Sequence, residues 1–173
     1  MQPTHSSRRI LLPVSSGFII LTLAVALALN LIPTGHLPGI PDWVALVLAF
    51  WSVREPLKIG MASGFALGLV MDVSYGSVLG QHPLGYVLVT YLASGLSRRV
   101  LWFPLAQQAL HILPILLAMQ VVMAVVRLIG GAAFPGWSYF LSSISATILW
   151  MPLNYLLLLP QFRPEEKDDN RPI

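Results

Sequence analysis

The stretch GMASGFALGLVMDVSYG, residues 60–76, places small or acidic residues at every fourth position of an otherwise apolar segment. These residues are Gly60, Gly64, Gly68, Asp72 and Gly76. On an α-helix they form one slowly winding stripe, because each step of four overshoots a full turn by about 40°. Overlapping GxxxG motifs in an apolar helix let a neighbouring helix approach closely. The stretch therefore predicts a buried helix–helix interface that ends on a carboxylate.

The composition is that of an integral membrane protein. Of the 173 residues, 56% are hydrophobic and only 10% are charged, and the mean hydropathy is +0.76. A soluble domain carries about 25% charged residues, so this chain has too little polar surface to cover a water-soluble body. Apolar runs long enough to cross a bilayer recur along the sequence. We predict an all-α membrane protein built as a compact bundle.

Prolines between the apolar runs divide the chain into about six transmembrane helices. The predicted spans lie near 14–32, 41–53, 58–76, 83–97, 105–129 and 137–159. The second and fourth are short for a bilayer that needs about 20 residues, so they are either extended by flanking residues or packed as partial spans inside the bundle. We expect residues 1–160 to form a single transmembrane helical domain. Residues 161–173 are polar and are predicted to be a disordered cytoplasmic tail.

The distribution of charge orients this bundle. Nine of the ten Lys and Arg residues fall on one side of the six-span arrangement: Arg8, Arg9, Arg54, Lys58, Arg98, Arg99, Arg163, Lys167 and Arg171. The loops on the other side, 33–40, 77–82 and 130–136, carry none. The positive-inside rule therefore predicts that both termini are cytoplasmic. The inner turns that carry Arg54, Lys58, Arg98 and Arg99 can also meet anionic lipid.

Asp72 is expected to need a partner or water, because an ionised carboxylate at the centre of a membrane helix costs about 2.5–3.5 kcal/mol on insertion scales. Arg127 is the one basic residue away from the cytoplasmic side. Two interpretations remain open. Asp72 pairs with Arg127 across the bundle, or Asp72 caps the backbone of the outer loop while Arg127 extends to lipid headgroups.

No motif for catalysis, a metal or a cofactor is present in the sequence. It contains no HExxH zinc motif, no Walker phosphate loop and no cysteine, and its GMASG segment differs in spacing from the GxSG serine-protease motif. His82 and Asp72 can approach each other on the outer side, but two such residues are a weak indication of a metal site. The net charge is only +3, and the basic residues lie in pairs at helix ends. Nucleic-acid binding would need them on one face.

Several ordered motifs resemble the MreD family, the rod shape-determining membrane proteins of bacteria. The matching segments are PDW at 41–43, a Trp before a basic turn at 51–58, GFALGLVMD at 64–72, GSVLGQH at 76–82 (with Gly80 and His82), QQAL at 107–110 and WMP at 150–152. The resemblance implies a multi-pass protein of the bacterial inner membrane. It also implies a bundle similar to the substrate-binding subunits of energy-coupling-factor transporters.

The same resemblance implies a non-catalytic component of the complex that elongates the bacterial cell wall. Its partners would be MreC, the MreB filament directly or through MreC, and RodA with its transpeptidase partner. The alternative, which follows from the shared fold, is a small-solute-binding membrane subunit of a transporter. Asp72, His82 and Arg127 would then be ligand contacts.

Overall fold

The computed structural model describes residues 14–33 and 39–161. All regular secondary structure in these ranges is helical, so the all-α prediction is confirmed. The helices are α1 (Ser16–Leu31), α2 (Trp43–Arg54), α3 (Met61–Tyr75), α4 (Gln81–Trp102), α5 (Leu105–Ile129) and α6 (Leu141–Leu158), with short 3-10 helices η1 (Trp137–Phe140) and η2 (Leu159–Gln161) at either end of α6. The predictions for Arg8, Arg9 and the tail beyond residue 161 lie outside the described residues.

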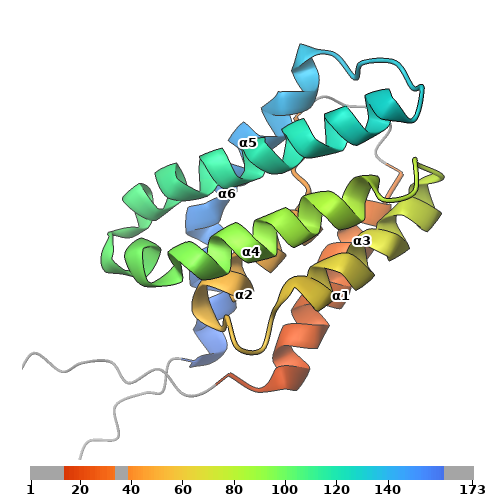
Figure 1. Ribbon diagram of the computed structural model, residues 1–173. Coiled ribbons are helices and arrows are strands. Elements are labelled where there is room, and N and C mark those ends of the chain that lie inside the picture. The colour runs from red at the N-terminus through yellow and green to blue at the C-terminus, as the bar shows by residue number, and fades with distance from the viewer. Residues whose placement is uncertain (1–13, 34–38, 162–173) are drawn as a thin grey trace, which may run out of the picture.

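The helices have their connections at two opposite ends of the bundle (Figure 1). The α2–α3 and α4–α5 turns lie on the same side as the start of α1 and the end of α6. We call this side the basic end, because it carries Arg54, Lys58, Arg98 and Arg99. The α3–α4 loop and the loop that leads from α5 into η1 lie on the opposite side, which we call the loop end.

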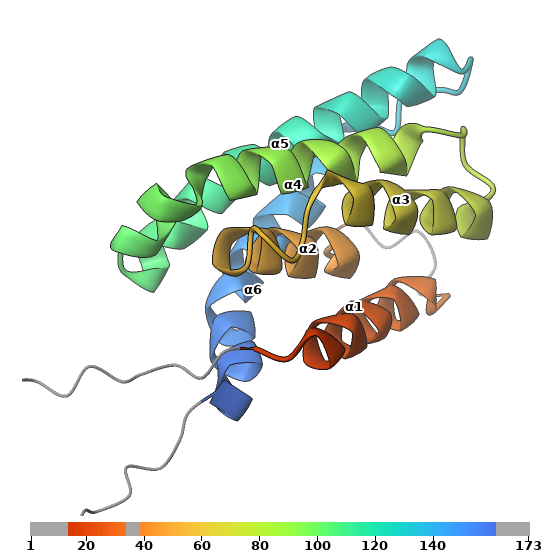
Figure 2. The same ribbon diagram turned by 60° about the horizontal axis from the view of Figure 1, so that its bottom comes forward.

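Helix α2 is the centre of the bundle. All ten residues from 44 to 53 are buried, as expected for a helix that is hydrophobic around its whole circumference. Figure 2 shows α2 between α1 on one side and the α4–α5 pair on the other. Its 12 residues measure about 18 Å at 1.5 Å per residue. This helix is therefore packed inside the protein, and its neighbours form the surface.

The outer surface is apolar while polar side chains lie inside. Large exposed hydrophobic residues occur on every α-helix except α2, and buried polar residues include Asp72, Gln120 and Asn154. Such an extensive exposed apolar surface is typical of a protein that contacts lipid. By length and composition, two helical stretches of the described chain could cross a membrane, Leu105–Ile129 and Trp137–Gln161. Helices α1, α2 and α3 are also apolar, but shorter.

Two glycines of the stripe bring α3 and α4 into close contact. A Cβ atom on Gly64 would lie 2.8 Å from the carbonyl oxygen of Tyr86, and one on Gly68 would lie 2.4 Å from backbone atoms of Pro83. Gly60 and Gly76 do not take part, since neither has an atom within 4 Å of such a Cβ. The predicted interface is thus limited to the middle of the stripe, because Gly60 and Gly76 flank α3 as its N-cap and C-cap.

Helix α4 is longer than the range 83–97 predicted for the fourth span. It begins at Gln81 and continues to Trp102, which corresponds to about 33 Å. Pro83 is the third residue of the helix, where a missing N–H costs no helical hydrogen bond. Arg98 and Arg99, expected after the span, lie within the last turns of α4 and are exposed.

Candidate functional site

The carboxylate of Asp72 organises the loop between α3 and α4. Its Oδ1 accepts hydrogen bonds from the Ser77 hydroxyl at 2.8 Å and the His82 backbone N–H at 3.0 Å. Its Oδ2 accepts one from the Gly80 backbone N–H at 2.6 Å. Only 1% of Asp72 is exposed. The side chain therefore supplies an acceptor to the start of α4, where backbone donors have no partner within the helix.

Glycines make this loop possible. Gly76 ends α3 with φ of +58°, and its N–H and that of Ser77 both reach the carbonyl of Asp72. This is the arrangement of a helix C-terminus closed by a left-handed residue. Gly80 has φ of +97° and is the N-cap of α4. Residues with a side chain are strained in this region of φ. Gly76 and Gly80 are therefore required by the backbone conformation of the turn.

His82 links this loop to the interior of the loop end. Its Nδ1 lies 2.6 Å from Oδ1 of Asp72, which realises the approach of these two residues suggested by the sequence. The ring lies between Tyr75, stacked at 5.8 Å, and Tyr86, edge-on at 5.9 Å. These contacts hold the imidazole in place at the wall of a cavity, which His82 helps to line.

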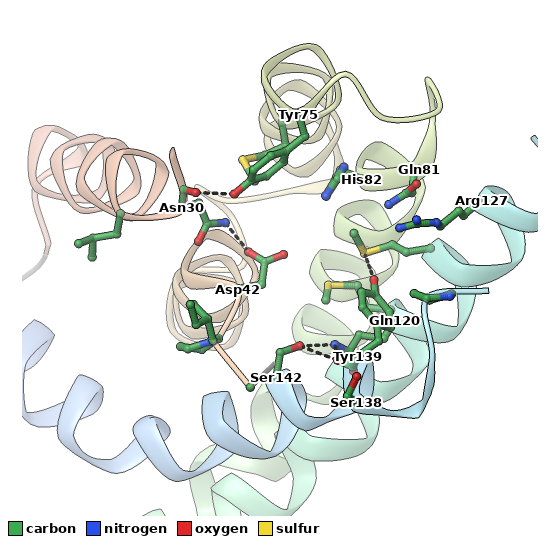
Figure 3. Close-up of a pocket in the computed structure, with 18 residues that line it drawn as sticks. Asn30, Asp42, Tyr75, Gln81, His82, Gln120, Arg127, Ser138, Tyr139 and Ser142 are labelled. Atoms are coloured by element: carbon green, nitrogen blue, oxygen red, sulfur yellow. Dashed lines mark hydrogen bonds between the residues drawn. The ribbon is translucent and has the colours of Figure 1, made fainter. Parts of the chain in front are cut away.

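A cavity of about 580 Å³, lined by both polar and apolar side chains, occupies the loop end of the bundle. Figure 3 shows its walls. The polar side chains that line it come from α1 to α6 and η1: Asn30, Asp42, Tyr75, Gln81, His82, Gln120, Arg127, Ser138, Tyr139 and Ser142. Met71, Met119 and Met123 provide much of its apolar wall. The volume is in the range of pockets that bind small organic molecules, roughly 300–1,000 Å³.

Asp42 lies on one wall of this cavity. It is the N-cap of α2 and accepts a hydrogen bond from the Ala45 backbone N–H at 3.0 Å, as its position after Pro41 suggests. The structure adds two long-range contacts: Oδ1 accepts from the Asn30 amide at 2.8 Å, and the Tyr86 hydroxyl lies 2.9 Å from Oδ2. One carboxylate thus ties α2 to α1 and α4.

Arg127 lies on the opposite wall, and the predicted ion pair with Asp72 is not formed. The guanidinium donates from Nε to the Ala133 carbonyl at 3.1 Å, whereas Asp72 is occupied by the α3–α4 loop. The interpretation of Asp72 as a cap of the loop backbone is therefore correct. Figure 3 shows Arg127 next to Gln81 across the cavity from Asp42, so its terminal nitrogens lie at the cavity wall.

The predicted basic residues at the other end have different surroundings. Arg54 donates to the Asn154 side chain at 3.3 Å and lies over the Phe50 ring at 5.4 Å. Lys58 donates to the Val14 carbonyl at 2.7 Å. Arg98 and Arg99 are exposed. Arg54 and Lys58 therefore join segments of the fold, and Lys58 is also exposed at the surface, as Arg98 and Arg99 are.

Sequence reasoning missed several cavity residues, among them Asn30, Gln81 and Gln120. Asn30 and Gln120 are single polar residues within apolar runs, which is a usable indication of an inward-facing position in a membrane helix. Gln81 adjoins His82 in the quoted motif but has no periodicity that marks it. Among the described residues, no group of three or more metal-ligating side chains is close enough to hold a metal ion.

Comparison with known proteins identifies the family of this chain. A family model described as rod shape-determining protein MreD matches residues 8–159. The chain is also 29% identical over 140 residues to the rod shape-determining protein MreD of Haemophilus influenzae, an alignment that covers 79% of this chain and 83% of that protein. No solved structure matches the chain, so the similarity to energy-coupling-factor subunits stays a prediction.

Both matches are to shape-determining proteins, and neither is to a transporter subunit, which leaves the solute-transport alternative without support. The family match extends from before α1 to the last turn of the α6 segment. It includes the Asp72 loop and every described element that lines the cavity. This chain belongs to the MreD family of rod shape-determining membrane proteins.

Proposed function

We propose that this protein is a non-catalytic membrane component of the bacterial cell-wall elongation complex. It organises or regulates lateral peptidoglycan synthesis together with MreC, the MreB filament and RodA with its transpeptidase partner. The observation that carries this proposal is the family match over residues 8–159, since family membership points to a role in determining rod shape. The match covers the whole helical bundle, so the proposal concerns this fold and not a small shared motif.

The described structure supports a role based on contacts within the membrane. Its helices are joined by short connections, and exposed hydrophobic side chains cover its outer helices. Within residues 14–33 and 39–161, the surfaces open to a partner are the helix faces, the loop end and the basic end. In this proposal Asp72 and the glycines Gly64 and Gly68 maintain the shape of the surface presented to partners.

The protein is further proposed to span the bacterial inner membrane several times with the basic end in the cytoplasm. Exposed Arg98 and Arg99 would there meet anionic lipid headgroups. The loop end, with its cavity, would face the outer side of the membrane. The charge distribution between the two ends is the argument for this orientation.

The absence of cysteine allows this orientation to be tested without background labelling. We expect Ala133→Cys, at the loop end, to react with a membrane-impermeant maleimide in spheroplasts. Arg99→Cys, at the basic end, should react only after the membrane is opened. Both positions are exposed, so a difference in labelling reports sidedness. Labelling of the Arg99→Cys variant in sealed spheroplasts would contradict the proposed orientation.

Depletion in the natural host tests the functional proposal. We expect rods to swell into spheres as the protein is lost, because lateral wall synthesis would no longer be organised, and to recover when the wild-type chain is supplied. Cell width and length are measured by phase-contrast microscopy. Rods that keep their shape after the protein has disappeared from the membrane fraction would overturn the proposal.

A further inference from the structure

The cavity at the loop end has the chemistry of a ligand site. The proposed role in cell shape predicts neither the residues that line it nor a ligand that it would bind. Its lining residues come from all six α-helices or their caps, and its volume of about 580 Å³ is sufficient for a small organic molecule. Some polar side chains on its walls have all their hydrogen-bonding groups paired within the protein, whereas others have groups without a partner in the described residues. The unpaired groups determine which ligand the cavity can bind.

The wall that contains Arg127 and Gln81 has free hydrogen-bond donors. Gln81 is only 8% exposed, yet its side-chain amide has no hydrogen-bond partner among residues 14–33 and 39–161. The amide lines the cavity and is not among the fully buried polar groups, so its oxygen and its nitrogen are both available to a ligand. Arg127 uses Nε for the Ala133 carbonyl, and its two terminal nitrogens make no hydrogen bond within the same ranges. A guanidinium with free terminal nitrogens suits a carboxylate or phosphate group.

The opposite wall presents an acceptor. Oδ1 of Asp42 is used by Asn30, Ala45 and Tyr86, while Oδ2 has the Tyr86 hydroxyl as its one protein partner in the described residues. A carboxylate oxygen accepts about two hydrogen bonds. Figure 3 shows the Asp42 carboxylate facing the cavity across from Arg127 and Gln81. The two walls therefore carry opposite charges. One has the cationic Arg127 beside the neutral Gln81 amide, and the other has the anionic Asp42.

We propose that this cavity binds a small zwitterion whose acidic group is held by Arg127 and Gln81 and whose primary ammonium group donates to Asp42. His82 and the methionines of the wall contact the part of the ligand between these groups. This chemistry can come from a free amino acid-like solute or from the headgroup of a phospholipid with a primary amine. The inference concerns binding alone, and it does not depend on the proposed role in wall elongation.

The test uses the full chain purified in detergent, with isothermal titration calorimetry and thermal unfolding as readouts. The soluble probes are glycylglycine and O-phosphoethanolamine, which carry an acidic and an ammonium group. For the lipid source, the protein is placed in nanodiscs of phosphatidylcholine with or without phosphatidylethanolamine. Phosphatidylcholine is the matched reference because its quaternary ammonium has no N–H to donate.

We expect at least one probe to bind, with Gln81→Leu, Arg127→Gln and Asp42→Asn each weakening it at least tenfold. Gln81→Leu is the most informative variant, because its side chain makes no hydrogen bond in the described protein and its loss should leave the fold intact. Asp42→Asn keeps a good helix N-cap. Arg99→Gln is the matched control, since Arg99 is exposed at the basic end, and it should bind like the wild type.

The outcomes separate the sources and can overturn the proposal. Binding of the soluble probes identifies a free solute as the ligand class, and stabilisation by phosphatidylethanolamine alone identifies a lipid headgroup. Absence of binding to every probe overturns the proposal. So does binding that Gln81→Leu and Arg127→Gln leave unchanged, since the ligand would then occupy another surface.

Discussion

Replacing Gly68 by alanine is expected to destabilise the protein by about 3 kcal/mol, the upper part of the range for overpacked cores. The added Cβ would lie 2.4 Å from both the Cα and the N of Pro83. These are backbone atoms, which cannot move aside as a flexible side chain can. The α3 and α4 helices must therefore separate along their contact, and membrane helices depend on such close packing for their association.

The measurement is unfolding of the purified protein in mixed dodecyl maltoside and SDS micelles, followed by far-UV circular dichroism. Gly95→Ala is the matched control, because Gly95 lies within α4 and a Cβ there would have no atom within 4 Å. Alanine favours a helix over glycine by about 1 kcal/mol, so this control should be neutral or stabilising. Equal losses for the two variants would show that the α3–α4 contact is not close at Gly68.

Replacing Asp72 by asparagine is expected to cost about 2–3 kcal/mol, because the group is buried and its partners are donors. Asparagine keeps the shape of the side chain, but its NH₂ group would face the Gly80 N–H or the donors at Oδ1. At least one buried or part-buried backbone N–H is then left unpaired, and the charge opposite His82 is lost. The expected readout is a lower unfolding midpoint in the same micelles.

Glu55→Gln is the control for Asp72→Asn. Glu55 lies 3.3 Å from Lys58 in a pair whose side chains are about one-third exposed, and such pairs contribute roughly 0–1 kcal/mol. In the depleted host, Asp72→Asn should then restore rods less well than the wild type, with less protein in the membrane fraction. Full stability of Asp72→Asn would show that the hydrogen bonds of the loop do not depend on the charge of the carboxylate.

The sequence predicted the burial of Asp72 but not its partners. Periodicity placed it on the glycine stripe, and the choice between Arg127 and the outer loop remained open because both lie near the loop end. The tertiary structure decides this by the conformation of two glycines. Gly76 and Gly80, at positive φ, turn residues 77–82 back over the end of α3, so the Asp72 carboxylate meets donors ten residues or fewer away along the chain.

For the glycine stripe, too, the sequence predicted one property and the tertiary structure decided another. Its spacing predicts a close helix contact, but four-residue periodicity continues beyond the part that is used. Only Gly64 and Gly68 lie where α3 and α4 are in close contact, because Gly60 and Gly76 cap the helix ends. Where two helices meet depends on their relative position, which the sequence of one helix does not contain.

The sequence by itself determined the class of protein, its helical content, the separation of basic residues to one end and the family. These properties depend on composition, on local periodicity and on ordered motifs, all of which can be read along the chain. The tertiary structure alone decided that α2 lies at the centre and that Asp42, Gln81 and Arg127 share a cavity. Asp42 caps α2, whereas Gln81 and Arg127 belong to α4 and α5, and only the packing of these three helices brings the side chains together.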